Sequence, residues 1–398
     1  MKITDIRCAV IGSHPIVRII TDEGISGYSQ IESYKPYLRD HVLLYRDELI
    51  GMDPTNVERC MLRIRNRGSF KPWGASVSAI EMALWDIAGK AAGLPVYKLL
   101  GGKIRDRVRV YNGAVRSEVT AQTPEAYAAS VRAMKAHPFG FSIVKMGIAF
   151  HSNMRYDVPN FMYGEPVRTK SHGFTTRGLL TPQGFNLIVE CVEAMRAELG
   201  DEIGLALDCG PGFMLPDAIK LAKALEHLNI AWLEDMLTGD YVPWTNPDVY
   251  RDLTTATTIP IHTGEQIYLR HNFRELIQKL AVRIVGPDPC DVGGIAELKW
   301  VAEFADMHGV MMAPHGTGNG LLGLAALVNV AATLPQNYIA FEMPYGKPDW
   351  WFDIVEGLPD PLVVNSQIEV WDRPGMGVEL IPAKAEKYLL PEDAGFFD

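Results

Sequence analysis

The stretch that decides the fold is residues 203–234, IGLALDCGPGFMLPDAIKLAKALEHLNIAWLE. It begins with an apolar run that ends in Asp208, continues with a helical pattern, and closes with a second apolar run that ends in Glu234. Apolar runs without polar alternation are typical of parallel strands that are covered on both faces. The stretch therefore predicts a strand, a helix and a second parallel strand, with a carboxylate at the end of each strand.

The same pattern recurs along most of the chain. From about residue 108 onward, short apolar runs alternate with helical stretches, and most of the runs end in a polar or charged residue. The runs are residues 108–113, 142–145, 203–208, 230–234, 260–265, 282–288, 310–315 and 338–342. Eight parallel strands that alternate with helices predict an α/β protein with a closed TIM-type barrel, and a doubly wound open sheet is the alternative.

The N-terminal part of the chain has a different pattern. Three short runs predict an antiparallel meander of strands, and three longer stretches predict helices. The predicted strands are residues 3–10, 16–21 and 25–30, and the predicted helices are 37–50, 54–65 and 75–92. We expect residues 1–110 to form an α+β domain on which segment 361–398 folds back. Residues 111–360 then form the barrel, with an insertion over residues 151–181.

The composition limits the classes of function. The chain has 398 residues, 47% hydrophobic and 22% charged, which excludes a disordered, collagenous or coiled-coil protein. Its formal net charge of −10 would repel a phosphate backbone, so we expect no nucleic-acid partner. No signal peptide or membrane span is visible, and the five cysteines form no C-x-x-C pair. These features predict a cytoplasmic homo-oligomer with reduced thiols that acts on a small molecule.

Ionisable side chains stand at the ends of seven successive runs. They are Lys145, Asp208, Glu234, Glu265, Asp288, His315 and Glu342. From Asp208 onward, neighbouring members are 23 to 31 residues apart, which is the length of one strand–helix unit. Because the carboxyl ends of barrel strands surround one open mouth, this spacing predicts an active site built from these residues.

Three of these residues predict a metal site. Asp208, Glu234 and Glu265 follow one another on the third, fourth and fifth barrel strands. Three carboxylates in one mouth repel each other unless a cation lies between them. Ligation by oxygen alone suits Mg²⁺, with Mn²⁺ as the second choice. The alternative is that the three residues cap the following helices or pair with surface lysines.

His315 and Asp288 predict an acid–base pair. They end neighbouring strands, and a carboxylate beside an imidazole fixes its tautomer and raises its basicity. The flanking sequence APHGTGNG supplies glycines that would let a substrate approach closely. The alternative is a structural histidine whose hydrogen bonds are satisfied within the protein.

Lys145 and Glu342 predict the remaining chemistry at the mouth. Lys145 lies across the mouth from His315, so it could act as a second base if its pKa were lowered by burial and a nearby metal ion. Glu342 lies in an apolar run, where desolvation favours a protonated acid that donates a hydrogen bond to an anionic intermediate. The alternatives are a structural or carboxylate-binding lysine and a core salt bridge.

Two loop regions predict contacts with a substrate. The insertion carries basic residues that could bind a distal carboxylate or hydroxyl groups, or could simply be solvated: Arg155, Arg168 and Arg177. In the N-terminal part, His14 and the glycine-bounded segment that holds Lys71 and Trp73 would complete the pocket as a lid. Ordinary loop packing is the alternative for these three residues.

The same residues resemble a known family. The order Lys, Asp, Glu, Glu, Asp, His, Glu on strands two to eight, SAIEMALWDIAGKAAGLPVYKLLGG at 78–102, and DPCDVGGI at 288–295 are similar to the mandelate racemase subgroup of the enolase superfamily. The resemblance implies a (β/α)7β barrel under an α+β capping domain. It further implies Mg²⁺ on Asp208, Glu234 and Glu265, and an Asp288–His315 dyad that serves abstraction of a proton α to a carboxylate.

The resemblance leaves several reactions open. Our first expectation is a Mg²⁺-dependent dehydratase of a sugar acid, an aldonate or aldarate, in which His315 expels the β-hydroxyl from an enediolate to give a 2-keto-3-deoxy acid. The second is an epimerase, racemase or cycloisomerase of a carboxylic acid that uses Lys145 and His315 as opposed bases. The resemblance leaves open whether Lys145 is a base or an electrostatic helper. A non-catalytic, metal-dependent sensor of sugar acids is a third hypothesis.

Overall fold

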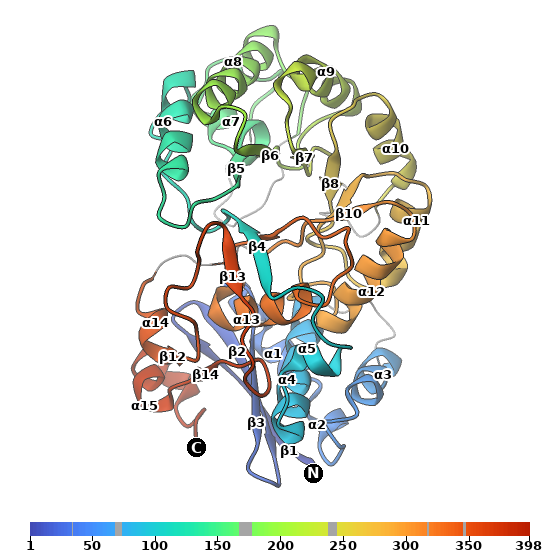
Figure 1. Ribbon diagram of the computed structural model, residues 1–398, viewed down its shortest axis with the longest axis vertical. Coiled ribbons are helices and arrows are strands. Elements are labelled where there is room, and N and C mark those ends of the chain that lie inside the picture. The colour runs from blue at the N-terminus through green and yellow to red at the C-terminus, as the bar shows by residue number, and fades with distance from the viewer. Residues whose placement is uncertain (34, 68–73, 167–176, 238–244, 317, 345–347) are drawn as a thin grey trace.

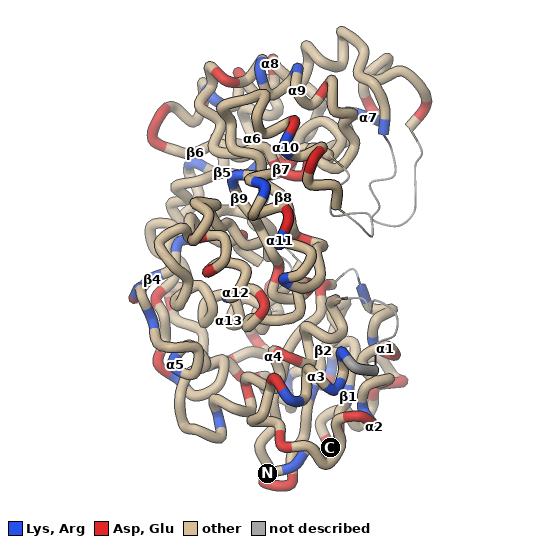
Figure 2. The backbone as a smooth tube through the Cα atoms, turned by 90° about the vertical axis from the view of Figure 1, so that its right-hand side faces the viewer, with Lys and Arg blue, Asp and Glu red and all other residues tan. Residues whose placement is uncertain are grey.

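The chain folds into a barrel with a second α+β part stacked against one end of it (Figure 1). The structure, a computed structural model, describes all residues except 34, 68–73, 167–176, 238–244, 317 and 345–347. Both termini lie at the end of the molecule that the α+β part forms (Figure 1). Basic residues (Lys and Arg) and acidic residues (Asp and Glu) are interspersed along the chain in both parts (Figure 2). Among the described residues, no helix has the length and apolar character needed to cross a membrane.

The N-terminal part is a three-stranded antiparallel sheet covered by helices. The strands are β1 (Ile3–Ile11), β2 (His14–Thr21) and β3 (Ser26–Gln30), in that order across the sheet. The helices include α3 (Val57–Arg67) and α4 (Gly74–Ala92). The meander and these two helices were predicted from the sequence.

The helix predicted over residues 37–50 is wrong as a single element. It is divided into η1 (Pro36–Leu38), α1 (Arg39–Leu43) and α2 (Arg46–Leu49). Tyr45 stands at the second break with φ −90° and ψ −3°. Its buried ring packs edge-on against His41, with ring centroids 5.4 Å apart. Burial of this ring, a tertiary effect, accompanies the interruption of the helical pattern.

The eight predicted barrel strands are all present. They are β4 (Arg107–Tyr111), β5 (Ile143–Gly147), β6 (Gly204–Asp208), β7 (Trp232–Glu234), β8 (Ile261–Thr263), β9 (Ile284–Val285), β10 (Met311–Met312) and β11 (Phe341–Glu342). Strands β5 to β10 pair in parallel in chain order, and β11 pairs in parallel with β4. A parallel bridge from Met312 to Tyr338 joins β10 to the run that leads into β11. The predicted TIM-type barrel is therefore confirmed.

Helices follow the strands on the outside of the barrel, as Figure 1 shows. They are α6 (Pro124–Lys135), α8 (Pro182–Leu199), α9 (Leu215–Leu225), α10 (Pro247–Thr255), α11 (Arg270–Gln278), α12 (Ile295–Asp306) and α13 (Gly320–Ala331). Helices α6 and α8 each begin with proline after a threonine whose side chain accepts a backbone N–H of the first turn. Proline fixes the helical φ angle there, and the threonine satisfies an otherwise unpaired donor.

A side chain joins the barrel between β4 and β5. Asn112 follows β4 directly and is fully buried. Its Oδ1 accepts the backbone N–H of Lys145 at 2.5 Å, and its Nδ2 donates to the carbonyl of Lys145 at 3.0 Å. The amide thus replaces one residue of backbone pairing at this seam, and it fixes the backbone position from which the Lys145 side chain projects.

The C-terminal segment contacts both parts of the molecule. Strand β13 (Gln367–Glu369) pairs antiparallel with β4, so this piece of segment 361–398 lies on the barrel. We had expected the whole segment to lie on the N-terminal part. The last residues do reach β1, where the Asp393 carboxylate accepts the backbone N–H of Val10 at 2.7 Å. The predicted boundary between the two domains at residue 110 stays a prediction, and it would fall inside β4.

The seam between β4 and β5 gives a stability prediction. Asn112→Ala leaves the buried backbone N–H and carbonyl of Lys145 without their partner, so we expect the free energy of unfolding to fall by about 2 kcal/mol. Urea unfolding followed by tryptophan fluorescence measures this change. Asn272→Ala, on the exposed face of α11, is the matched control and should change the free energy by less than about 0.5 kcal/mol. Equal values for both variants would contradict a structural role for Asn112.

Candidate active site

Lys145 lies inside the barrel and contacts three carboxylates. It is two residues before the end of β5, so the prediction that it ends this strand is wrong, but its inward direction brings the ammonium up to the mouth. Its Nζ lies 2.6 Å from Glu234 Oε1, 3.1 Å from Glu342 Oε1 and 3.7 Å from Asp208 Oδ2. The side chain is 3% exposed, so these charges interact with little screening from water.

Carboxylates set the electrostatic surroundings of Lys145. Burial lowers the pKa of Lys145, but the carboxylates of Glu234 and Glu342 raise it more, and the net pKa lies well above the ordinary value. The predicted lowering requires a metal ion near the amine, so it stays a prediction. The sequence does not show that two carboxylates lie within hydrogen-bonding distance of the amine, where they favour the ammonium form.

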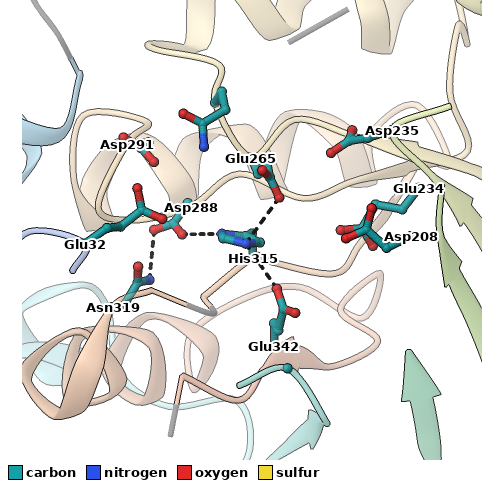
Figure 3. Close-up of polar contacts among 12 residues, drawn as sticks. Glu32, Asp208, Glu234, Asp235, Glu265, Asp288, Asp291, His315, Asn319 and Glu342 are labelled. Carbon is teal, nitrogen blue, oxygen red and sulfur yellow. Dashed lines mark hydrogen bonds and ion pairs between the residues drawn. The ribbon is translucent and has the colours of Figure 1, made fainter. Parts of the chain in front are cut away.

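His315 is held between three carboxylates, one of which, that of Glu342, also contacts Lys145 (Figure 3). Its Nδ1 lies 2.6 Å from Asp288 Oδ2, while its Nε2 lies 3.2 Å from Glu265 Oε2 and 3.3 Å from Glu342 Oε2. Burial lowers the pKa of His315, but the surrounding carboxylates, first that of Glu265, raise it to well above the ordinary value. The predicted pair of His315 and Asp288 is thus brought into direct hydrogen-bond contact.

The second oxygen of Asp288 fixes the orientation of the pair. Asp288 Oδ1 accepts the backbone N–H of Cys290 at 2.7 Å and the Asn319 side-chain amide at 2.9 Å. Asp288 is fully buried, and burial raises its pKa although the hydrogen bond from His315 opposes this shift. Because Asp288 accepts from Nδ1, the imidazole presents Nε2 toward the centre of the mouth.

The predicted metal ligands gather on the β6–β8 side of the mouth. Asp208 and Glu234 occupy paired positions of β6 and β7, and oxygens of Glu234, Asp235 and Glu265 lie within 4.8 Å of one another. Asp235 was not among the ligands predicted from the sequence. All of these groups are buried carboxylates, so the donor set fits a hard divalent cation such as Mg²⁺.

Two contacts distinguish Asp208 from Asp235. Asp208 Oδ1 lies 3.1 Å from Nδ1 of His151, a half-buried histidine on the loop after β5. Asp235 Oδ1 accepts the hydroxyl of Thr263 at 2.6 Å, so one of its oxygens is already held by the protein. Asp208 Oδ1 also accepts the backbone N–H of Gly210 at 3.3 Å, so each of the two aspartates has one oxygen held by the protein.

Glu342 lies in different surroundings from those expected. Its carboxylate is within 3.8 Å of Arg116, in addition to the contacts with Lys145 and His315. The prediction of an apolar environment is wrong because charged side chains from other parts of the chain contact this carboxylate. A Cβ on Gly113 would lie 2.2 Å from Glu342 Cγ, so only glycine at that position lets the glutamate reach the mouth.

The glycines around His315 also serve the protein itself. A Cβ on Gly316 would lie 2.7 Å from the carbonyl oxygen of Glu342, and one on Gly320 would lie 2.2 Å from Gln30 Nε2. We had interpreted these glycines as room for a substrate. The structure shows that they admit neighbouring parts of the chain, because this segment lies between β11 and the end of β3.

The predicted loop contacts fall into three groups. Arg155, on α7 (Met154–Asp157), donates to the carbonyl of Phe150 and stacks on Tyr156, so it holds the insertion together. Arg177 is exposed at the end of the insertion. The remaining residues, Arg168, Lys71 and Trp73, lie outside the described part of the chain. Substrate binding by these residues stays a prediction.

His14 begins β2 and is buried against an aromatic ring. Its imidazole packs edge-on against Trp351, with ring centroids 4.9 Å apart. Burial lowers the pKa of His14 to about 4, so the ring is neutral at neutral pH. These contacts indicate a packing role beside the mouth, and its predicted role in substrate binding is not tested by them.

Comparisons with known proteins agree with this geometry. The sequence model of the mandelate racemase / muconate lactonizing enzyme N-terminal domain matches residues 9–101, and that of the enolase C-terminal domain-like family matches residues 118–384. The chain belongs to the mandelate racemase and muconate lactonizing enzyme family of the enolase superfamily. The resemblance found in the sequence, and with it the barrel under an α+β capping domain, is confirmed.

Individual relatives align along nearly the whole chain. A D-xylonate dehydratase of Haloferax volcanii is 31% identical over 99% of this chain and 90% of its own length. A mandelate racemase/muconate lactonizing enzyme-like protein from Rubrobacter xylanophilus has a TM-score of 0.82 at 29% identity, with 98% of each chain covered. The 3,6-anhydro-D-galactonate cycloisomerase of Zobellia galactanivorans has a TM-score of 0.78 at 25% identity, with 98% of this chain and 100% of that chain covered.

His14 gives a prediction of pH dependence. Its pKa is about 4 in the folded protein and 6.5 in the unfolded chain, so the unfolded state binds more protons between these values. The free energy of unfolding should fall as the pH is lowered from 6.5 to 4, by up to about 3 kcal/mol from this residue. In His14→Phe this contribution is absent, and urea unfolding of both proteins at pH 7 and pH 4.5 measures the difference. The exposed His271→Phe should keep the wild-type pH dependence.

Proposed function

We propose that this chain is a Mg²⁺-dependent hydro-lyase that removes water from a sugar acid, an aldonate or aldarate. The observation that carries the proposal is the position of His315, whose Nε2 faces the mouth while Asp288 holds Nδ1 at 2.6 Å. The names of the relatives support the reaction, because they include D-xylonate and D-galactonate dehydratases. The chain is accordingly placed among enzymes of the lyase class that act on small carboxylic acids.

Removal of a proton α to a carboxylate is difficult because it leaves a second negative charge on the same group. A divalent cation, when bound by Asp208, Glu234 and Glu265, supplies positive charge next to the substrate carboxylate. Lys145 adds a second positive charge, since its ammonium lies 2.6 Å from Glu234. These residues make the mouth suitable for an enediolate dianion.

His315 performs both proton transfers in this proposal. As a neutral imidazole it accepts the proton from C2 at Nε2, and the resulting imidazolium is stabilised by the Asp288 carboxylate. The imidazolium then returns this proton to the β-hydroxyl, the C3–O bond breaks, and water leaves. The enol that remains takes up a proton at C3 and releases its hydroxyl proton, which gives the 2-keto-3-deoxy acid.

An epimerase, racemase or cycloisomerase is the second candidate. One observation favours it: the Glu342 carboxylate contacts Lys145 at 3.1 Å and His315 at 3.3 Å, so two basic side chains flank a common point. The likeness to a 3,6-anhydro-D-galactonate cycloisomerase agrees with this alternative. We favour dehydration because the relatives that align over more than nine-tenths of the chain include D-xylonate and D-galactonate dehydratases.

The cellular setting follows from the same proposal. All five cysteines are buried and free, which supports a cytoplasmic enzyme with reduced thiols. We also propose that the enzyme is a homo-oligomer without a nucleic-acid partner.

The reaction can be tested with a panel of sugar mono- and diacids. We expect one or more of them to yield a 2-keto-3-deoxy acid in the presence of Mg²⁺, detected as a keto product by a semicarbazide assay. His315→Asn should lower kcat by roughly 10²- to 10⁴-fold, because it removes the general acid and base. In D₂O, exchange of deuterium into C2 with all hydroxyl groups retained would indicate epimerisation. Ligand binding without turnover by the wild type would indicate a sensor.

The metal ligands can be tested separately from turnover. Loss of a residue that only orients a metal ligand typically lowers the metal affinity by roughly 10- to 100-fold. We expect Asp208→Asn to lower the affinity for Mg²⁺, measured by calorimetric titration, by more than this. Asp235→Asn should fall within that lower range, because Asp208 and not Asp235 belongs to the proposed ligand set. The reverse order would replace Asp208 by Asp235 in the proposed ligand set, and an unchanged affinity in both variants would exclude this metal site.

A further inference from the structure

The chain after β3 inserts from the N-terminal part into the mouth of the barrel. Ser33 donates its backbone N–H to the carbonyl of Gly318 at 3.2 Å, and Leu322 donates its N–H to Gln30 Oε1 at 3.2 Å. The thiol of Cys290 lies 3.5 Å from the carbonyl of Gln30. This segment therefore contacts the loops that carry Asp288 and His315.

Two charged residues of the inserted segment are buried there. Lys35 Nζ lies 2.7 Å from Asp291 Oδ1 and 3.3 Å from Gln266 Oε1, and it also contacts the Glu32 carboxylate. Glu32 is 0% exposed and Lys35 is 9% exposed. Gln266 follows Glu265 directly in the chain, so Lys35 connects the loop after β8 to the loop after β9.

Glu32 lies next to the acid–base pair. One oxygen of Glu32, one of Asp288 and one ring nitrogen of His315 lie within 4.8 Å of one another. Figure 3 shows Glu32 beside Asp288, on the side away from Glu265, Glu234 and Asp208. The mechanism described above makes no use of this glutamate, although it brings a buried carboxylate of the N-terminal part close to the dyad.

A second metal ion is not the best explanation of this cluster. Asp288 uses Oδ2 for His315 and Oδ1 for Cys290 and Asn319, so its donor capacity is already taken up. The charges also balance within the protein. Burial raises the pKa of Glu32, but Lys35 and then His315 lower it to about 2, while burial and the Glu32 charge raise the pKa of Asp291 well above its ordinary value.

We propose that Glu32 and Lys35 are positioning residues of the Asp288–His315 dyad, which couple the docking of the N-terminal part to the activity of the barrel. Lys35 holds the Glu32 carboxylate behind Asp288, where one Glu32 oxygen lies within 4.8 Å of an oxygen of Asp288 and a ring nitrogen of His315, so Glu32 limits the positions that the dyad can take. A dyad without this segment keeps its hydrogen bond but loses the buried charge that orients it. The kinetic side of this inference rests on the proposed dehydratase function.

The chain offers a matched control for a purely structural role. Glu81 of α4 is also a buried glutamate of the N-terminal part that contacts the barrel, since it accepts the backbone N–H groups of Ile295 and Ala296 at 2.9 and 3.0 Å. It caps the first turn of α12 and makes no contact with the dyad among the described residues. Glu81→Gln therefore weakens the same interface without altering the surroundings of His315.

The kinetic test compares Glu32→Gln and Lys35→Met with Glu81→Gln on the full chain with Mg²⁺. For the first two variants we expect kcat to fall on the order of tenfold or more, with the substrate KM within about twofold of the wild type. Glu32→Asp and Lys35→Arg should each recover part of kcat, and Glu81→Gln should leave kcat within about twofold. An equal loss of kcat in all three, or unchanged kcat in both dyad-side variants, would overturn the inference.

A second measurement needs no substrate and therefore separates this inference from the proposed function. The short bond between His315 Nδ1–H and Asp288 should give a low-field proton resonance, which is assigned by its loss in His315→Asn. We expect Glu32→Gln or, if that variant does not fold, Glu32→Asp to shift this resonance, whereas Glu81→Gln leaves it in place. An unmoved resonance overturns the inference even if the wild type is a dehydratase, and a moved one supports it even if no sugar acid is converted.

Discussion

The concentration of buried carboxylates at the barrel mouth is the constraint on which the rest of the site depends. Glu234 and Glu342 are both 0% exposed, and neither could stay ionised there without a positive charge close by. Lys145 contacts both, and His315 contacts Glu342 and Glu265. The protein thus balances the acidic groups with its own basic side chains, and a divalent cation adds to a network that is already connected. A change in the charge of one member of this network therefore alters the electrostatic environment of the others.

Barrel geometry explains why so much of the site can be predicted from the sequence. In a parallel barrel, residues one strand–helix unit apart come to the same end of neighbouring strands, so the spacing of Asp208, Glu234 and Glu265 translates directly into proximity. The exact positions are less predictable. Strands β9 and β10 are only two residues long, and Asp288 and His315 lie three residues beyond their ends. The apolar runs continue past the strands because the loops are buried as well.

Partners that come from distant parts of the chain could not be predicted in this way. The carboxylates that raise the pKa of Lys145 are first Glu234 and then Glu342, which is 197 positions further along the sequence from Lys145. The role of Glu32 depends on a segment that follows a strand of the other part. The sequence gives only weak evidence that His151 and Asp235 belong to the site. His151 begins the insertion, and Asp235 directly follows a predicted metal ligand. Neither periodicity nor motif spacing indicates which of these side chains turn toward the mouth, because tertiary packing decides their directions.

The mouth has two sides that differ in chemistry, and Glu342 connects them. On the β5–β8 side, Lys145 and the predicted metal ligands concentrate charge for a substrate carboxylate. In the proposed reaction, His315 and Asp288 on the β9–β11 side move protons, and the segment after β3 lies behind them. Since Glu342 contacts both Lys145 and His315, the charge of this carboxylate acts on both basic side chains. Glu342 is therefore a residue through which the two sides of the mouth interact electrostatically.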